Sequence, residues 1–369
     1  MKIFSKILRA IVITLAIVLL LPFCFTIIKM LLEGDEGAIT VLSVCLSFVL
    51  STYINVIVHE GGHLVFGLLC GYRFSSFRVG SIMMIKQGGM MKLRSYSLAG
   101  TDGQCLMIPP SRESTKAEMI LYNMGGVIFN IILVILCLGL NYIVPETFIL
   151  TDTIRICCLI SALLVLTNGI PLNMGGIAND GMNALHLSKN PVAAESFRKT
   201  LTINAAVAEG IKTSDMPDEW FTLPDGADMQ NPHNVALTVF AAGRPFDKGD
   251  TSAVETATEE LLNSDYNIIG LYRNMLTLDL IYCRLVNGSG EVEYYLTAPI
   301  KKFMKTMKNF PSVIRTEYAI ALLINRDEMA ASRILSAFEK NAHKYPYQQE
   351  IDTERMLMRK ALERFENNT

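Results

Sequence analysis

Charged side chains are scarce in this chain. Only 18% of its 369 residues are Asp, Glu, Lys or Arg, and the formal net charge is -2. A protein that binds nucleic acid needs a basic surface to neutralise phosphates, and the composition offers no such surplus. We therefore expect no nucleic-acid partner.

Paired cysteine motifs are absent as well. A cysteine zinc site or redox motif would show close CxxC pairs, and a disulfide framework belongs to short secreted domains. We interpret the cysteines as reduced residues that fill apolar packing. The 8 cysteines lie mostly within apolar runs, at Cys24, Cys45, Cys70, Cys105, Cys137, Cys157, Cys158 and Cys283.

Apolar residues are abundant in this chain and are gathered in long runs. Hydrophobic residues make up 51% of it, which is more than a soluble globule of this length usually carries. Four runs reach the roughly 20 residues that a bilayer-spanning helix needs. They cover residues 7–28, 39–69, 119–144 and 153–170. The predicted fold class is an α-helical polytopic membrane bundle with about four transmembrane helices.

The first run follows Lys2, Lys6 and Arg9, as in a secretory signal. It is too long for one, and no small-residue cleavage site follows it. We expect residues 1–37 to form an N-terminal transmembrane anchor, kinked at Pro22.

The distribution of Lys and Arg predicts the orientation. The N-terminal tail is basic, and the loop after the first run has no Lys or Arg. The tail and the loop 71–118 are therefore expected on the cytoplasmic side, with both termini cytoplasmic in a multi-pass protein of the cell membrane. That loop carries Arg73, Arg78, Lys86, Lys92, Arg94, Arg112 and Lys116.

The loop 71–118 also shows a β-hairpin pattern. The stretch SIMMIKQGGMMKLR places two β-prone runs around Gly88-Gly89, and SLAGTDGQCLMI repeats the pattern. A small β-hairpin at the membrane surface is one interpretation, and an ordinary loop is the other.

Residues 189–369 have the composition of a soluble α-helical domain. Two of its expected helix pairs end at Phe310-Pro311 and Tyr345-Pro346, a spacing close to the tetratricopeptide period. The domain is therefore either tetratricopeptide-like or an unrelated helical bundle. The catalytic membrane domain is expected to cover residues 38–188.

The segment VIVHEGGHLV carries the chemistry of that domain. His59 and His63 lie four residues apart on a helix, so that both rings can bind one Zn²⁺, and Glu60 is placed as the general base. The alternative, a set of satisfied polar core residues, is disfavoured because each ionisable group near mid-bilayer costs about 2.5–3.5 kcal/mol. Ser51 and Asn55 extend the same polar stripe toward the bundle interior.

A hydrolytic zinc site needs a third protein ligand. The other histidines, His186, His233 and His343, all follow the fourth apolar run. Asp180 is the better candidate, because it follows a Pro- and Gly-rich stretch at the end of that run. Unwound backbone at such a depth is tolerated where it lines a polar cavity.

These residues together resemble the site-2 protease family of intramembrane zinc metalloproteases. HEGGH within an apolar run is followed by Asn168, Pro171 and Asp180-Gly181, and Gly126 with Asn130 is similar to the family's Gly-Pro-x-x-Asn element. The resemblance covers about residues 38–188. It implies Zn²⁺ bound by His59, His63 and Asp180, with Glu60 as general base.

Two features depart from the family pattern. Eight residues separate Pro171 from Asp180 where the family usually has four, and the Gly-Pro element lacks its Pro. The longer spacing puts the role of Asp180 as third ligand in question.

The function implied is hydrolysis of peptide bonds in or near transmembrane or signal-like segments, close to the cytoplasmic face, as in regulated intramembrane proteolysis. Asn55, Asn130 and Asn168 are candidates to position substrate, or else only interhelical hydrogen-bond partners. The expected partners are the lipid bilayer, a membrane-protein or membrane-peptide substrate, and a protein on the C-terminal helical domain. The alternative is a catalytically idle, membrane-anchored scaffold that recruits a partner through that domain.

Overall fold

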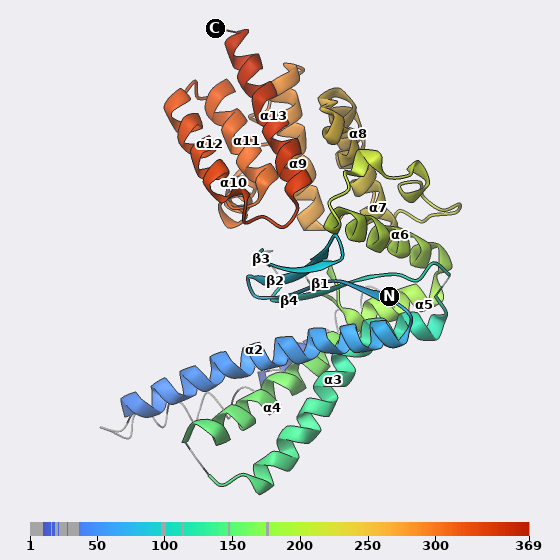
Figure 1. The fold of residues 1–369 in the computed structure, drawn as a ribbon, viewed down its shortest axis with the longest axis vertical. Helices are drawn as coiled ribbons and strands as arrows, with labels where there is room; N and C mark the ends of the chain where they lie inside the picture. Colours follow the sequence, from blue (N-terminus) through green and yellow to red (C-terminus); the bar gives the residue numbers. More distant parts are fainter. Residues whose placement is uncertain are drawn as a thin grey trace. The chain divides into compact units, whose positions relative to one another are not determined.

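The chain divides into two compact units, which Figure 1 shows as a ribbon. The computed structural model describes residues 10–15, 17–18, 21, 28, 37–96, 101–112, 114–146, 148–174 and 177–368. The first unit comprises residues 1–74, 102–105 and 110–190. The second comprises residues 75–101, 106–109 and 191–369, so most of the loop 71–118 groups with it.

Three long helices that pack against one another form most of the described first unit: α2 (Gly37–Leu69), α3 (Lys116–Ile143) and α4 (Phe148–Gly169). The segments Ile39–Leu69, Lys116–Ile143 and Ile149–Gly169 are long and apolar enough to cross a membrane. They correspond to the second, third and fourth predicted runs. The first predicted run, residues 7–28, lies largely outside the described residues.

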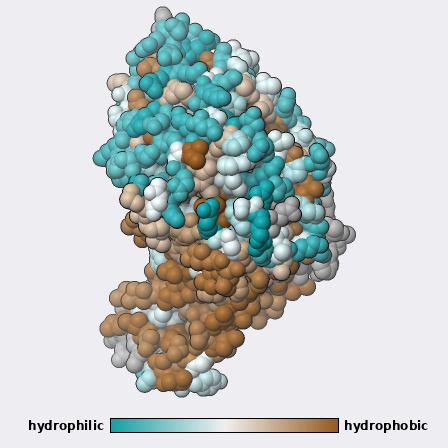
Figure 2. Space-filling view, turned by 45° about the vertical axis from the view of Figure 1, so that its right-hand side comes forward, coloured by the Kyte–Doolittle hydropathy of each residue, from teal (hydrophilic) through white to brown (hydrophobic). Residues whose placement is uncertain are grey.

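The outer faces of these helices are hydrophobic. Side chains such as Leu46, Ile57 and Leu136 are exposed, and Figure 2 shows hydrophobic residues gathered over this part of the surface. A soluble protein rarely exposes an apolar area of this kind, because water disfavours it. The first unit is therefore built to be surrounded by lipid.

The ends of α3 and α4 are defined by specific contacts. Thr115 and Glu118 form a capping box at the start of α3, and Arg112 pairs with Glu118. After α4 the chain forms a short antiparallel hairpin of β5 (Asn173–Met174) and β6 (Ile177–Ala178), and α5 (Asp180–Lys189) follows directly.

A four-stranded sheet has the strand order β3-β2-β1-β4. Its strands are β1 (Arg73–Val79), β2 (Ile82–Gln87), β3 (Met90–Ser95) and β4 (Gly103–Ile108), and the β1–β2 and β2–β3 pairs are antiparallel. Gly88 and Gly89 turn the β2–β3 hairpin with positive φ angles of 58° and 76°. This confirms the predicted hairpin, and β1 and β4 enlarge it to a sheet.

One face of the sheet packs within the second unit. Met83 and Ile85 on β2 are fully buried against Ala208, Tyr96 and Tyr347, while Met84, between them in sequence, points to the other face. This alternation is the period of two that a strand imposes.

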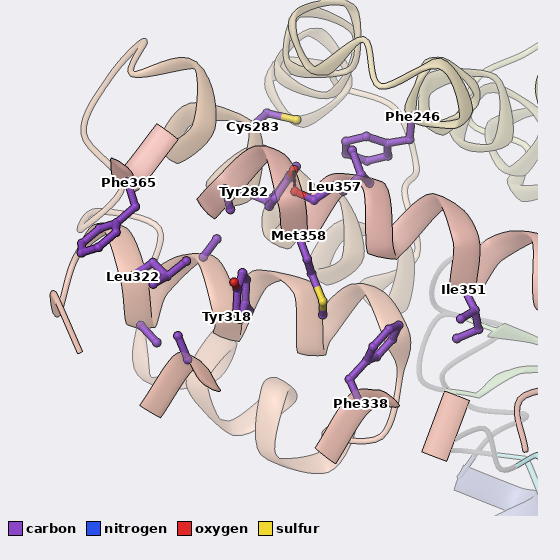
Figure 3. Close-up of a cluster of buried hydrophobic side chains, with 14 of the residues drawn as sticks. Phe246, Tyr282, Cys283, Tyr318, Leu322, Phe338, Ile351, Leu357, Met358 and Phe365 are labelled. Carbon is purple, nitrogen blue, oxygen red and sulfur yellow. Dashed lines mark hydrogen bonds between the residues drawn. The ribbon is translucent and has the colours of Figure 1, made fainter. Parts of the chain in front are cut away.

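Eight helices make up the rest of the described second unit. Figure 3 shows the largest of its hydrophobic clusters, in which Tyr282, Leu322, Phe338, Leu357 and Phe365 are buried. The structure confirms a helical domain, and the tetratricopeptide likeness stays a prediction. The helices are α6 (Pro191–Ala208), α7 (Pro232–Gly243), α8 (Thr251–Asn263), α9 (Gly270–Asn287), α10 (Ala298–Thr306), α11 (Pro311–Leu323), α12 (Glu328–Ala342) and α13 (Gln348–Glu366), with short 3-10 turns at Thr213–Asp215, Asp218–Trp220 and Arg244–Lys248.

Candidate active site

Two imidazoles and one carboxylate converge inside the first unit. His59 and His63 lie one turn apart on α2, and Asp180 is the first residue of α5. Asp180 Oδ2 is 3.1 Å from His59 Nε2 and 3.5 Å from His63 Nε2, and the two Nε2 atoms are 3.3 Å apart. Within the described part of the chain, this is the one group of such side chains with the spacing of a metal site.

The hydrogen bonds of the two rings leave both Nε2 atoms facing the centre. His63 Nδ1 is 2.9 Å from the backbone carbonyl oxygen of Tyr122, and His59 Nδ1 is 2.7 Å from Oδ1 of Asn130. An oxygen of this kind only accepts, so each ring donates from Nδ1, and Nε2 is the nitrogen left to bind a metal ion. Metal-binding histidines are usually held in this way.

Asp180 completes a set of donors suited to a cation. Its Oδ2 is buried and makes no hydrogen bond in the described structure. Three lone-pair atoms at these distances repel one another unless a proton or a metal ion lies among them. Two imidazole nitrogens and one carboxylate oxygen form a ligand set that Zn²⁺ uses in hydrolytic enzymes. The residues present therefore fit a zinc ion.

Glycines allow α3 to approach the two histidines. A methyl group on Gly62 of α2 would overlap the Gly125 carbonyl of α3, so the two backbones touch there. A methyl group on Gly126 would lie 2.6 Å from His59 Cε1 and 2.7 Å from Nε2 of His63. Any larger side chain at these positions would push α3 away from the rings.

Asn179 determines where Asp180 lies. Its amide nitrogen donates to the carbonyls of Thr167 and Ile170 at the end of α4, at 2.6 Å each. Its amide oxygen accepts from the backbone nitrogens of Leu172 and Met182. The chain between α4 and α5 leaves as β5 and returns as β6, and Asn179 closes the base of that hairpin. The long interval between Pro171 and Asp180 is therefore accommodated without moving Asp180 away from α4.

Glu60 is buried next to His59 and lies against the start of β4. A methyl group on Gly103 would lie 2.7 Å from Glu60 Cγ and 2.8 Å from Val56 Cγ1. The first residue of an outermost strand therefore packs against the candidate base.

The other residues singled out from sequence are placed as follows. Asn55 and Asn130 are fully buried in one hydrogen-bonded chain that reaches His59. Asn168 is in the last turn of α4, half-buried. Of the remaining histidines, His186 lies on α5 and His233 and His343 in the second unit, and all three lie outside the cluster.

Sequence reasoning missed Tyr122, Asn179 and Gly103. Tyr122 acts through its backbone carbonyl, which leaves no sequence signal. Asn179 did carry one, because Asn directly before a helix start is a preferred N-cap. Gly103 would have been recognisable only as a site of close packing.

An apolar bundle of three long helices, with two histidines on α2 and an aspartate on α5 brought together, has the arrangement expected of a membrane-embedded metallopeptidase. The chain belongs to peptidase family M50, the site-2 protease family, whose family model matches residues 47–344. Members of this family are membrane proteases that generally depend on zinc. No curated protein and no solved structure matches the chain. The resemblance inferred from the sequence is thereby confirmed.

Proposed function

We propose that the protein is an intramembrane zinc endopeptidase that cleaves peptide bonds in or near transmembrane or signal-like segments, close to the cytoplasmic face. The observation that carries this proposal is the convergence of His59 Nε2, His63 Nε2 and Asp180 Oδ2 in the first unit, with Glu60 adjacent in sequence. Zn²⁺ bound by these three residues would supply a Lewis acid that lowers the pKa of water and polarises a carbonyl.

Glu60 supplies the acid–base chemistry in this proposal. Its carboxylate takes a proton from the attacking water and passes it to the leaving amine. Burial against Gly103 and Val56 limits the positions that the carboxylate can occupy. A group with a restricted position loses little freedom when the reaction begins.

The strand β4 is the proposed guide for the substrate. A protease must bind an extended peptide, and an outermost strand can pair with one through backbone hydrogen bonds. β4 stands at one edge of the described sheet, and its first residue packs against Glu60. A peptide added along β4 would therefore pass the base in extended form.

The cytoplasmic placement rests on charge. The loop that follows α2 is rich in Lys and Arg, and His59 and His63 lie in the half of α2 nearer to that loop. Positive loops are retained on the cytoplasmic side. We therefore place the site near that face, with both termini cytoplasmic.

The test is cleavage of single-span peptides by the purified full-length protein, compared with Glu60→Gln. Loss of the base should slow cleavage by about 10²- to 10⁴-fold while one zinc per chain remains bound, since Glu60 is not a ligand. Glu260→Gln, an exposed position on α8, is the matched control and should cleave like the wild type. Cleavage by Glu60→Gln at the wild-type rate would refute the mechanism, and a wild type that binds zinc but cleaves no peptide would favour the idle scaffold.

A further inference from the structure

A chain of fully buried polar side chains runs from His59 into the bundle. Asn130 on α3 contacts His59, Asn55 on α2 contacts Asn130, and Ser161 on α4 contacts Asn55. Asn55, Asn130 and Ser161 are each 0% exposed. Polar groups buried this deeply in an apolar bundle are costly unless their hydrogen bonds are complete.

The carbonyl groups at the far end of this chain determine which way the Asn55 amide faces. Asn55 Nδ2 lies 2.9 Å from the carbonyl oxygen of Ser51 and 3.2 Å from that of Cys157. Carbonyl oxygens only accept, so the NH₂ end of Asn55 must face them. Oδ1 of Asn55 must then face the opposite way, toward Asn130 and the Ser161 hydroxyl, which donates to it.

The orientation of Asn55 in turn determines that of Asn130. With the Asn55 oxygen facing it at 3.3 Å, Asn130 must present its NH₂ group there and its oxygen to His59. His59 is then protonated on Nδ1, and its Nε2 lone pair faces Asp180 and His63. A flipped Asn130 would present NH₂ to Nδ1 and favour a proton on Nε2, where it would compete with a metal ion.

We propose that Asn55 and Ser161 are positioning residues that set the tautomer of His59 through Asn130. This inference rests on the proposed zinc site. His63 needs no such device, because its Nδ1 donates to the backbone carbonyl of Tyr122, which cannot flip. Of the two ring ligands, His59 alone is held through side chains that a substitution can change.

The experiment measures zinc affinity by chelator competition on the full-length protein. Each substitution is made in the wild-type protein and in the Asn130→Asp variant. Asn55→Leu removes the anchor, so Asn130 can flip, and zinc binding should weaken by about 10- to 100-fold. Asn130→Asp offers an acceptor from either end of its side chain and cannot flip into a donor. In that background Asn55→Leu should change zinc affinity little, which gives a strongly non-additive double-mutant cycle.

Ser47→Ala is the matched control for Ser161→Ala. Both serines are fully buried between α2 and α4, but Ser47 contacts the carbonyl of Ile149, three turns from His59. Ser161→Ala should weaken zinc binding in the wild-type background only, and Ser47→Ala in neither. This pair also keeps the proposal testable if Asn55→Leu does not fold.

Two results would overturn the proposal: unchanged zinc affinity in Asn55→Leu and Ser161→Ala, or an equal loss in both backgrounds, which marks general damage to packing. In either case a wild type that binds one zinc leaves the proposed function intact. A wild type that binds no zinc would overturn both.

Discussion

Each unit of the molecule buries a cluster of ionisable groups, and the two clusters differ in the source of positive charge. In the second unit, Arg315 on α11 is 1% exposed and forms ion pairs with Asp279 on α9 and Glu354 on α13. The guanidinium also lies over the rings of Phe246 and Tyr282, at 4.7 and 4.5 Å from their centres. This cluster carries its own cation.

The cluster in the first unit has no such partner. The contacts that the structure describes for Asp180 Oδ2 are with the two imidazole rings, whose side chains are 11% exposed, as against 20% for Asp180. The positive charge that would balance these donors is not an Arg or Lys side chain among the described contacts, and has to be a proton on an imidazole or a bound cation. The comparison therefore separates a cluster that contains its own Arg cation from one whose donors could hold a metal ion.

The largest effect is expected when the cluster of His59, His63 and Asp180 loses one of its three proposed ligands. Asp180→Ala should abolish both the binding of one zinc per chain and peptide cleavage. The loss of zinc affinity should exceed the about 10- to 100-fold expected for substitutions of residues that contact the ligands. Zinc content per chain and the peptide cleavage rate measure this. Asp225→Asn, at an exposed loop position of the second unit, should alter neither. Retention of one zinc per chain in Asp180→Ala would mean that another residue is the third ligand.

A smaller effect is expected when the cluster of Arg315, Asp279 and Glu354 loses its cation. Arg315→Met leaves Asp279 and Glu354 buried without a partner, which should destabilise the helical domain by about 3–5 kcal/mol. Hydrogen exchange of α9, α11 and α13 in the full-length protein reports that loss. Zinc affinity should stay at the wild-type value, and Arg333→Met, an exposed position on α12, should change neither quantity. If Arg315→Met released zinc, the two clusters would not be independent.

The smallest effect is expected from pH acting on two carboxyls of α13, Glu354 in the Arg315 cluster and Glu350 one turn before it. Burial, together with nearby carboxylates, raises the pKa of Glu350 to about 7, against a hydrogen bond from Tyr345. Burial likewise raises the pKa of Glu354 to about 7, against the charge of Arg315. Between pH 4.5 and 7 the folded state holds protons that the unfolded state has released, so stability falls as pH rises.

From pH 6 to 7 this loss should stay below about 1.4 kcal/mol per carboxyl. Urea midpoints measured across that interval test it. Glu350→Gln should flatten the dependence, whereas Glu260→Gln should leave it unchanged. A midpoint that rises with pH would show that these carboxyls are ionised in the folded protein.

The sequence was most informative where one local pattern determines the result. His59, Glu60 and His63 are a short pattern on one helix, and Gly88-Gly89 between β-prone runs predicted the β2–β3 hairpin. Strand β1 was not predicted, because its Ser75 and Ser76 interrupt any apolar alternation. Such a strand is recognisable only when its partner strands are known.

Long-range pairings were beyond the reach of sequence reasoning. Arg315 looks like any basic residue on a helix until α9 and α13 bring Asp279 and Glu354 to it. The series of hydrogen-bonded side chains from Ser161 to His59 also joins residues from three helices. Asp180 was identified as a candidate, but its position depends on Asn179 and on the hairpin that precedes it, which spacing alone could not show.

The hairpin of β5 and β6 also makes this position suitable for engineering. Asn179 is anchored to the end of α4 through Thr167 and Ile170, so an insertion between β5 and β6 need not displace Asp180. The entropic cost of a longer loop grows only slowly with its length. An epitope tag or a fluorescent reporter peptide inserted between β5 and β6 would thus label the first unit close to its candidate metal site and leave Asp180 in place.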